Sequence, residues 1–496
     1  VAYDKVQQDW FLYTVATGEK VNLTENMDVE FVNDEHDTPS LASANGSAVW
    51  FEDSKSFLIR DKFDFWQFDP LKPGTPKMFT DGYGRKNDTQ LSVTQIIEDP
   101  DKAPANPMMR MFGGAMESKK NETIYFTTYN RTTKQNGLAM KDKGKAPVKK
   151  IVEGPYTFGD FKYSKPGKGK KGIFVYARGN FEEGNNLFAS YDNFKTQKQM
   201  SDINPQQRDY NWGTVELVNW QTADDIFCEG LLFKPEDFDP NKKYPVMIYF
   251  YEKNANTLYR HRNPSPSRST VNIPYFVSNG YVVFVPDVYF TEGHPGQSAM
   301  KSIMPGVEML EKTYPWIDGE NMAIQGQSWG GYQVAYMITQ TNKFKAAGAG
   351  APVSNMTSAY GGIRWGSGIT RQVQYEQGQS RIGKPLWEAF DLYYENSPLF
   401  FLPNVSTPVL IMHNDKDGAV PWYQGIEMFV GLRRLGKVAW LLQYNNEEHN
   451  LVERRNCKDL SIRLSQFFDH YLKGAPMPEW MKNGRPATKK RYDLFY

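Results

Sequence analysis

The chain has 496 residues, long enough for two or more domains, and its 40% hydrophobic and 23% charged residues are typical of a globular protein. Its 58 basic and 57 acidic residues leave a formal net charge of +1, which argues against a nucleic-acid partner bound through phosphate contacts. No apolar run approaches the length of a membrane span.

The cysteine and histidine content predicts no metal and no cofactor. The two cysteines, Cys228 and Cys457, are expected to be unlinked thiols. Cysteine and histidine form no cluster with the spacing of metal ligands, so no structural zinc is expected. Asn-x-Ser/Thr triplets, such as those at Asn22 and Asn130, favour a periplasmic or extracellular location, with the cytoplasm as the alternative. The sequence leaves open whether the protein forms a homodimer.

Residues 1–210 are expected to form an all-β domain, because short apolar strands alternate there with polar turns. Repeated units of strand, turn, strand and Asp are typical of the blades of a β-propeller. At about 40–50 residues per blade, the region would hold about four blades. The alternative is an independent β-sandwich. Because the sequence opens in mid-blade, we expect N-terminal sequence to be missing.

From Trp220 onward the pattern changes to that of an α/β domain, which we assign to residues 211–496. Long apolar strands, such as Tyr281–Val285 and Phe344–Ala351, alternate with helical segments. This alternation predicts a doubly wound, parallel sheet with helices on both faces. A terminal helix is expected over Leu460–Leu472.

The segment Gly326–Gly331 has the pattern G-x-S-x-G, with Ser328 at its centre. It follows the apolar run Met322–Ile324 and precedes the helical pattern Tyr332–Ile338. This strand–turn–helix context is the one that a nucleophile elbow requires. The alternative is a glycine-rich turn in which the serine only caps the helix.

Two partners for Ser328 follow in the order that an α/β-hydrolase uses, acid and then histidine. Asp417 comes shortly after the apolar run Pro408–Met412, and His449 follows the run Val438–Tyr444. Strand ends are where open α/β sheets build their sites. An imidazole activates a serine hydroxyl, and a carboxylate fixes the tautomer of the imidazole. Alternatively, Asp417 caps a turn and His449 is a solvated loop residue.

With these residues in place, the region from about residue 211 to 475 resembles the prolyl oligopeptidase family of serine peptidases. The resemblance lies in Met322–Gly331, His413–Pro421, Glu448–His449 and the opening segment Gly230–Pro245. It implies an α/β-hydrolase fold preceded by a β-propeller that admits only peptides or small segments.

The same resemblance implies further site residues. Tyr251 would contribute a hydroxyl, and Trp329 its backbone N–H, to stabilise an oxyanion; an ordinary strand aromatic, like Tyr249, is the alternative for Tyr251. The implied substrate pocket consists of Val353, Met356, Tyr360 and Val420. Met356 and Ala359 stand where proline-selective relatives have aromatic residues, and Ala419 where relatives often grip a carbonyl. Selectivity for proline is therefore not implied.

Charged residues near the pocket segment and in the β region have two interpretations each. Arg364, Arg371 and Arg381 either select an acidic group or hold local carboxylates such as Glu376. Glu182 and Glu183 either bind a free N-terminus, as in dipeptidyl-peptidase relatives, or belong to a hairpin turn.

The sequence thus predicts a serine peptidase that acts on oligopeptides, with Ser328 as nucleophile, His449 as general base and Asp417 as the residue that orients it. One alternative is an esterase for small acylated substrates. The other is a propeller-based binding protein with a vestigial hydrolase.

Overall fold

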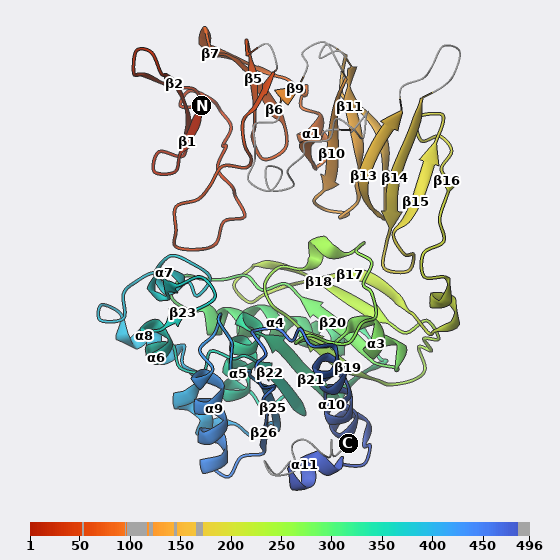
Figure 1. The fold of residues 1–496 in the computed structure, drawn as a ribbon, viewed down its shortest axis with the longest axis vertical. Coiled ribbons are helices and arrows are strands. Elements are labelled where there is room, and N and C mark those ends of the chain that lie inside the picture. Colours follow the sequence, from red (N-terminus) through yellow and green to blue (C-terminus); the bar gives the residue numbers. More distant parts are fainter. Residues whose placement is uncertain are drawn as a thin grey trace. The chain divides into compact units, whose positions relative to one another are not determined.

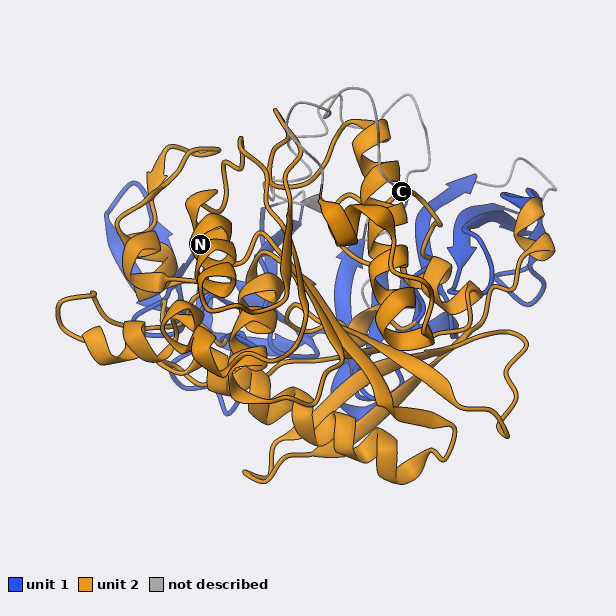
Figure 2. Ribbon diagram, turned by 90° about the horizontal axis from the view of Figure 1, so that it is seen from below, with its two compact units in different colours: residues 1–36, 41–205, 259–261 blue, residues 37–40, 206–258, 262–496 orange. Residues whose placement is uncertain are grey.

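A computed structural model describes residues 1–51, 54–94, 96, 117–118, 123–142, 146–164 and 172–484. The chain divides into two compact units, shown in Figure 2. Unit 1 consists of residues 1–36, 41–205 and 259–261, and unit 2 consists of residues 37–40, 206–258 and 262–496. The sequence-based domain boundary between residues 210 and 211 stays a prediction.

In its described residues, unit 1 is built of β-sheets joined by short turns and includes the short helix α1 (Tyr83–Lys86) (Figure 1). Neighbouring strands run antiparallel, except for the parallel pair β4 and β9. In the described residues, the first sheet has the strand order β1 (Ala2–Asp4), β2 (Asp9–Thr14), β3 (Glu19–Asn22), and the second has the order β7 (Lys72–Met78), β6 (Phe65–Asp69), β5 (Phe57–Arg60), β4 (Val49–Phe51), β9 (Glu117–Ser118). The third sheet has the order β12 (Lys149–Gly154), β11 (Asn136–Lys141), β10 (Ile124–Asn130), β8 (Thr89–Thr94). The fourth has the order β13 (Thr157–Ser164), β14 (Ile173–Gly179), β15 (Asn186–Ser190), β16 (Lys198–Gln199).

The sheets of unit 1 pack face to face in succession. In β5, Phe57 and Ile59 share a core with Trp10 of the first sheet, whereas Leu58 shares a core with Phe126 of the third. Successive side chains of a strand point to opposite faces, so a strand that is apolar at every position is buried on both sides. This face-to-face stacking of small antiparallel sheets is propeller-like.

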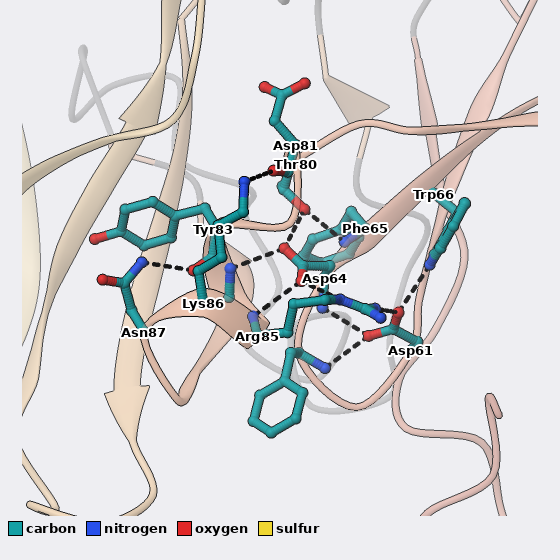
Figure 3. A network of polar contacts seen from close by, with 12 residues as sticks. Asp61, Asp64, Phe65, Trp66, Thr80, Asp81, Tyr83, Arg85, Lys86 and Asn87 are labelled. Atoms are coloured by element: carbon teal, nitrogen blue, oxygen red, sulfur yellow. Dashed lines mark hydrogen bonds and ion pairs between the residues drawn. The ribbon is translucent and has the colours of Figure 1, made fainter. Parts of the chain in front are cut away.

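Two buried aspartates fix the turns beside β6 (Figure 3). Asp64 accepts hydrogen bonds from Thr80 Oγ1 at 2.7 Å, from Gly84 N at 2.9 Å and from Nε of Arg85 at 3.0 Å. Nη2 of Arg85 contacts Asp61. A buried carboxylate is tolerated only when donors satisfy its oxygens, and here the surrounding turns supply them.

Unit 2 is an eight-stranded sheet with helices on both faces (Figure 1). Its first two strands are antiparallel to their neighbours and all later pairs are parallel. The strand order is β17 (Thr214–Gln221), β18 (Phe227–Lys234), β20 (Val282–Pro286), β19 (Tyr244–Tyr249), β21 (Ile317–Gln327), β22 (Ala346–Gly350), β25 (Val409–Met412), β26 (Ala439–Leu442). The longer helices are α3 (Ile273–Ser278), α4 (Pro295–Thr313), α5 (Trp329–Gln340), α9 (Tyr423–Arg434) and α10 (Arg454–Lys473). The shorter elements are η3 (Pro205–Asp209), η4 (Ala255–Thr257), α6 (Met356–Tyr360), β23 (Ile363–Arg364), β24 (Ile369–Thr370), α7 (Gln372–Glu376), α8 (Phe390–Glu395), η5 (Pro398–Asn404) and α11 (Glu479–Asn483).

Strand β22 consists only of Ala and Gly because helices approach it from both sides. Ala347 and Ala349 share a core with Val334 of α5. On the opposite face, a Cβ on Gly348 would lie 3.1 Å from the ring of Phe468 in α10. A sheet covered on both faces by helices is the doubly wound arrangement. The predicted fold class, an α/β-hydrolase sheet preceded by an all-β, propeller-like domain, is confirmed.

Cys228 and Cys457 are buried and free, as the sequence predicts. Within the described ranges, none of the helices has the length and apolar character needed to cross a bilayer. In the same part of the chain, no group of three or more His, Cys, Asp or Glu side chains is placed to hold a metal ion. The compartment and the homodimer stay predictions.

Candidate active site

Ser328 lies at the turn between the end of β21 and the start of α5. Its backbone has φ 62° and ψ −116°, a conformation that non-glycine residues rarely adopt and that tertiary contacts must hold in place. One such contact is the hydrogen bond from Ser328 N to the carbonyl oxygen of Gly350, at 2.8 Å. The serine is half-buried, whereas Gln327 and Trp329 on either side are buried.

The glycines of the motif are required by close backbone approaches. A Cβ on Gly326 would lie 2.5 Å from the backbone of Gly330. A Cβ on Gly330 would lie 2.5 Å from the carbonyl oxygen of Phe250, and one on Gly331 would overlap the carbonyl oxygen of Gly350. Real Cβ atoms do not tolerate such contacts, so the elbow depends on glycine at all three positions.

Asp417 and His449 meet where two loops leave the ends of β25 and β26. Nδ1 of His449 donates a hydrogen bond to Oδ2 of Asp417 at 2.7 Å. Oδ1 of Asp417 accepts from the backbone N–H groups of Ala419 and Val420, both at 2.8 Å. The carboxylate therefore fixes the tautomer of the imidazole, with its proton on Nδ1 and Nε2 left as the base.

A second imidazole reaches the same carboxylate. His413, fully buried, places Nε2 3.3 Å from Oδ2 of Asp417. Burial disfavours the charge on Asp417, but the hydrogen bonds from His413 and His449 outweigh it and lower the pKa of Asp417 well below its usual 3.8. The carboxylate thus stays charged beside the imidazole of His449. His413 opens the sequence motif that contains Asp417, and its contact with the carboxylate gives that position a physical reason.

The serine elbow and the histidine loop are in direct contact. Gln327, the residue before Ser328, donates from its side-chain amide to the carbonyl oxygen of His449 at 3.0 Å. Asn414 donates in the same way to the carbonyl oxygen of Glu448 at 2.7 Å. These amides bring the three predicted residues to the same edge of the sheet. Sequence reasoning missed both, because nothing in their local pattern indicates such distant partners.

Glu447 is a third supporting residue that sequence reasoning missed. It is 3% exposed, and its carboxylate accepts hydrogen bonds from Val452 N at 2.7 Å, Glu453 N at 3.1 Å and Asn456 Nδ2 at 2.6 Å. It thus joins the loop of His449 to the first turn of α10. Burial alone would raise the pKa of Glu447. These hydrogen bonds to the charged carboxylate lower the pKa by more than burial raises it, so the net shift is downward. A carboxylate at a helix N-terminus also has favourable electrostatics.

Tyr251, one of the two predicted oxyanion residues, lies beside the elbow. A Cβ on Gly330 would be 3.6 Å from Cδ2 of Tyr251. The Tyr251 carbonyl accepts from Gln333 of α5 at 2.6 Å, and its hydroxyl accepts from Gln379 at 2.9 Å. As the first residue of α5, Trp329 has a backbone N–H without an intrahelical partner.

The four predicted pocket residues gather in one apolar cluster next to the elbow, together with Trp329. Each is at most 3% exposed. The members from the predicted set are Val353, Met356, Tyr360 and Val420. Their role as a substrate pocket stays a prediction.

Two of the arginines and the acidic pair have structural partners. Arg381, 2% exposed, donates to the carboxylate of Asp37 at 2.8 Å and lies 3.4 Å from that of Glu252, so it holds local carboxylates. Arg371 donates to the carbonyl oxygen of Ala419. In unit 1, the backbone N–H groups of Glu182 and Glu183 both donate to Asn180 Oδ1. Such hydrogen bonds are typical of a turn, so the pair fits the second of its two interpretations, a hairpin turn.

Comparisons with known proteins agree with this geometry. The sequence is 26% identical over 289 residues to the uncharacterized peptidase YuxL of Bacillus subtilis, covering 56% of this chain and 42% of that protein. It is 25% identical over 256 residues to dipeptidyl-peptidase 5 of Porphyromonas gingivalis, covering 48% and 35%. The matched region thus spans less than half the length of these relatives. In fold, the chain is similar to acylaminoacyl peptidase from Pyrococcus horikoshii, with a TM-score of 0.59, 16% identity, and coverage of 94% of this chain and 66% of that one.

The sheet order, the strained serine and the neighbouring aspartate–histidine pair define the class of unit 2, an α/β-hydrolase. Residues 266–475 match the model of the prolyl oligopeptidase family. The resemblance to the prolyl oligopeptidase family of serine peptidases that the sequence indicates is therefore confirmed over residues 266–475.

Proposed function

We propose that the chain hydrolyses peptide bonds of oligopeptides through a covalent acyl-enzyme on Ser328. The observation that carries the proposal is the half-buried serine on a strained elbow, joined through Gln327 to a loop whose histidine is hydrogen-bonded to Asp417. Such chemistry needs a serine hydroxyl, an imidazole that takes its proton and a carboxylate that orients the imidazole.

In the proposed reaction, Nε2 of His449 takes the proton from Oγ of Ser328 as that oxygen attacks the substrate carbonyl. The imidazolium then gives the proton to the leaving amine, and the C–N bond breaks to leave an ester on Ser328. A water molecule, deprotonated by the same imidazole, hydrolyses the ester. Asp417 keeps its charge throughout and stabilises the imidazolium.

The negative oxygen of each tetrahedral intermediate would accept hydrogen bonds from the backbone N–H of Trp329 and the hydroxyl of Tyr251. The proximity of Tyr251 to Gly330, at the start of α5, supports this role. The apolar cluster of Val353, Met356, Tyr360 and Val420 adjoins the same helix end and would receive an apolar part of the substrate.

A fluorophosphonate probe tests the proposal, because it labels only an activated serine. We expect a single adduct on Ser328 in the folded protein and none in Ser328→Ala. Folded protein without an adduct on Ser328 would remove the proposal.

Substrate comparison separates the peptidase from its alternatives. A peptidase should cleave aminoacyl amides, whereas an esterase would turn over acyl esters and leave the amides intact. A probe-reactive protein that cleaves neither, yet retains a protein ligand, would favour a binding protein with a vestigial hydrolase.

A further inference from the structure

Two arginines of this molecule, the buried Arg463 and the exposed Arg85, use one edge of the guanidinium to hold carboxylates. Nε and Nη2 lie on the same edge, and in Arg463 they donate to the two oxygens of Asp459 at 2.7 and 3.1 Å. In Arg85 the same two nitrogens contact Asp64 and Asp61 (Figure 3). This fork of parallel N–H donors matches the geometry of a carboxylate.

Arg371 differs from these arginines. It is 1% exposed, and Nη1 donates to the carbonyl oxygen of Ala419. Its Nε and Nη2 have no hydrogen-bond partner among the described residues, and no described carboxylate lies within 4.0 Å of the guanidinium. The hydroxyl of the fully buried Tyr375 is the polar group beside the guanidinium, with the ring centroid 5.9 Å away. No hydrogen bond of regular geometry joins the two, yet the contact with Arg371 opposes the rise in the pKa of Tyr375 that burial causes.

Neither group is accounted for by the fold alone. A buried guanidinium without a counter-charge is destabilising, and unpaired buried donors add to that cost. Arginine remains charged in proteins, so deprotonation does not relieve it. Glu376, next to Tyr375 in the chain, accepts from the hydroxyl of Tyr360 at 2.5 Å and makes no ion pair with Arg371. Tyr375 is neutral and supplies no counter-charge, so the guanidinium of Arg371 still requires an anionic acceptor from elsewhere.

These donors adjoin both halves of the candidate active site. Ala419, whose carbonyl oxygen binds Arg371, donates its own N–H to Asp417. Tyr375 belongs to the apolar cluster that contains Trp329, the residue after the nucleophile. A substrate group that reached these donors would therefore lie next to the reacting carbonyl. The chain segment 364–370, immediately before Arg371, is exposed.

We propose that Arg371 is a specificity-determining residue that, with the hydroxyl of Tyr375, binds a carboxylate of the peptide substrate. The proposal rests on the peptidase function proposed for the same site. The carboxylate has two sources, the side chain of an Asp or Glu next to the cleaved bond or the C-terminus of a short peptide. Both present two coplanar oxygens to the Nε–Nη2 edge.

Matched peptides test the proposal and distinguish the sources. One pair differs only by Glu or Gln at the residue that donates the acyl group, and a second pair only by a free or amidated C-terminus. We expect kcat/KM to favour the carboxylate in one pair by about 10- to 100-fold, the range for hydrogen bonds to charged groups. Ratios below about two in both pairs would overturn the proposal.

Variants assign the preference to these donors. Arg371→Gln should reduce the favoured ratio to near one, and the exposed Arg364→Gln serves as the matched control that retains it. Because Arg371→Gln also loses the contact with Ala419, its absolute rates will fall, so the ratio is taken within each variant. Tyr375→Phe removes only the hydroxyl and should lower the ratio by about 3- to 10-fold. A ratio unchanged in both Arg371→Gln and Tyr375→Phe would overturn the assignment.

Binding provides a readout that does not depend on turnover. Calorimetry on Ser328→Ala with the Glu and Gln peptides, and with the acid and amide peptides, should show the same preference. Fluorophosphonate labelling of the wild type separates the two proposals. A labelled enzyme that cleaves peptides without a carboxylate preference contradicts only the role of Arg371, whereas the absence of labelling contradicts the peptidase itself.

Discussion

The elbow around Ser328 and the two loops that carry Asp417 and His449 meet at one edge of the sheet but are held in different ways. The elbow is fixed by backbone packing, since Gly326, Gly330 and Gly331 each face main-chain atoms too closely for a side chain. The loops are fixed by side-chain hydrogen bonds between residues far apart in the chain.

Because the elbow and the loops are held differently, we expect substitutions in them to have different effects. A substitution at an elbow glycine introduces a steric overlap, which affects folding and activity together. A substitution in the loops removes a hydrogen bond or a charge, which affects the protonation state and position of His449 while the sheet remains folded. Four predictions test how far this separation holds.

Asp417→Asn should have the largest effect, a fall in kcat of about 10⁴-fold. The amide oxygen would stay with the N–H groups of Ala419 and Val420, so the NH2 group would donate to Nδ1 of His449 and favour the wrong tautomer. The measurement is kcat on the best amide substrate, with folding checked by circular dichroism. Asp415→Asn is the matched control: Asp415 accepts from Asn446 N at 2.7 Å in the same loop but does not contact His449 in any described interaction. Equal losses in the two variants would contradict the assignment of Asp417.

Tyr251→Phe should lower kcat by about 10²- to 10³-fold, the range for the loss of one oxyanion donor, with little change in KM. The fold should tolerate the change, because Gln379 retains its hydrogen bond to Glu252 at 2.8 Å. Tyr249→Phe, at the end of β19 and two residues earlier in the chain, is the control. If the control loses as much activity as Tyr251→Phe, the tyrosine at 251 is only a packing residue.

Gly331→Ala should destabilise the protein by about 1–3 kcal/mol, because its Cβ would overlap the carbonyl oxygen of Gly350 and the helix would have to shift. Urea unfolding measures the change. Gly361→Ala is the control, since a Cβ there meets nothing within 4 Å and the backbone has φ −77°. Wild-type stability and full probe labelling of Gly331→Ala would show that the elbow does not depend on this approach.

The same difference explains what could be predicted from the sequence. The elbow is recognisable because its glycines and the adjoining strand and helix are consecutive. Asp417 and His449 could be found from their places after apolar strands. The supporting amides of Gln327 and Asn414 could not, because their partners, His449 and Glu448, lie 122 and 34 residues away in the chain. Among the arginines, Arg371 and Arg381 look alike in sequence, and only the positions of carboxylates distinguish them.

The terminal helix shows this limit at a boundary. The apolar pattern predicts a helix over Leu460–Leu472, whereas α10 begins at Arg454. Its first turn is polar, so no apolar periodicity marks it. Glu447, which lies before the helix in the chain, accepts hydrogen bonds from the N–H groups of Val452 and Glu453 and from the side chain of Asn456 in the first turn, and so anchors the start of α10.

Glu447→Gln should have the smallest effect, a loss of about 1 kcal/mol of stability at neutral pH, the usual value of a helix N-terminal acceptor. Glu453→Gln is the matched control, because Glu453 makes no side-chain capping bond to the same helix. The pKa of Glu447 is lowered in the folded protein, so its contribution is fully present above the unfolded value near about 4.3 and is lost as the pH falls through the folded value. The difference in unfolding free energy between wild type and Glu447→Gln should therefore shrink as the solution is made more acidic. A difference that stayed constant down to the acid limit of folding would mean that the charge of Glu447 does not stabilise the start of α10, and that the loop of His449 is held by the amide contacts alone.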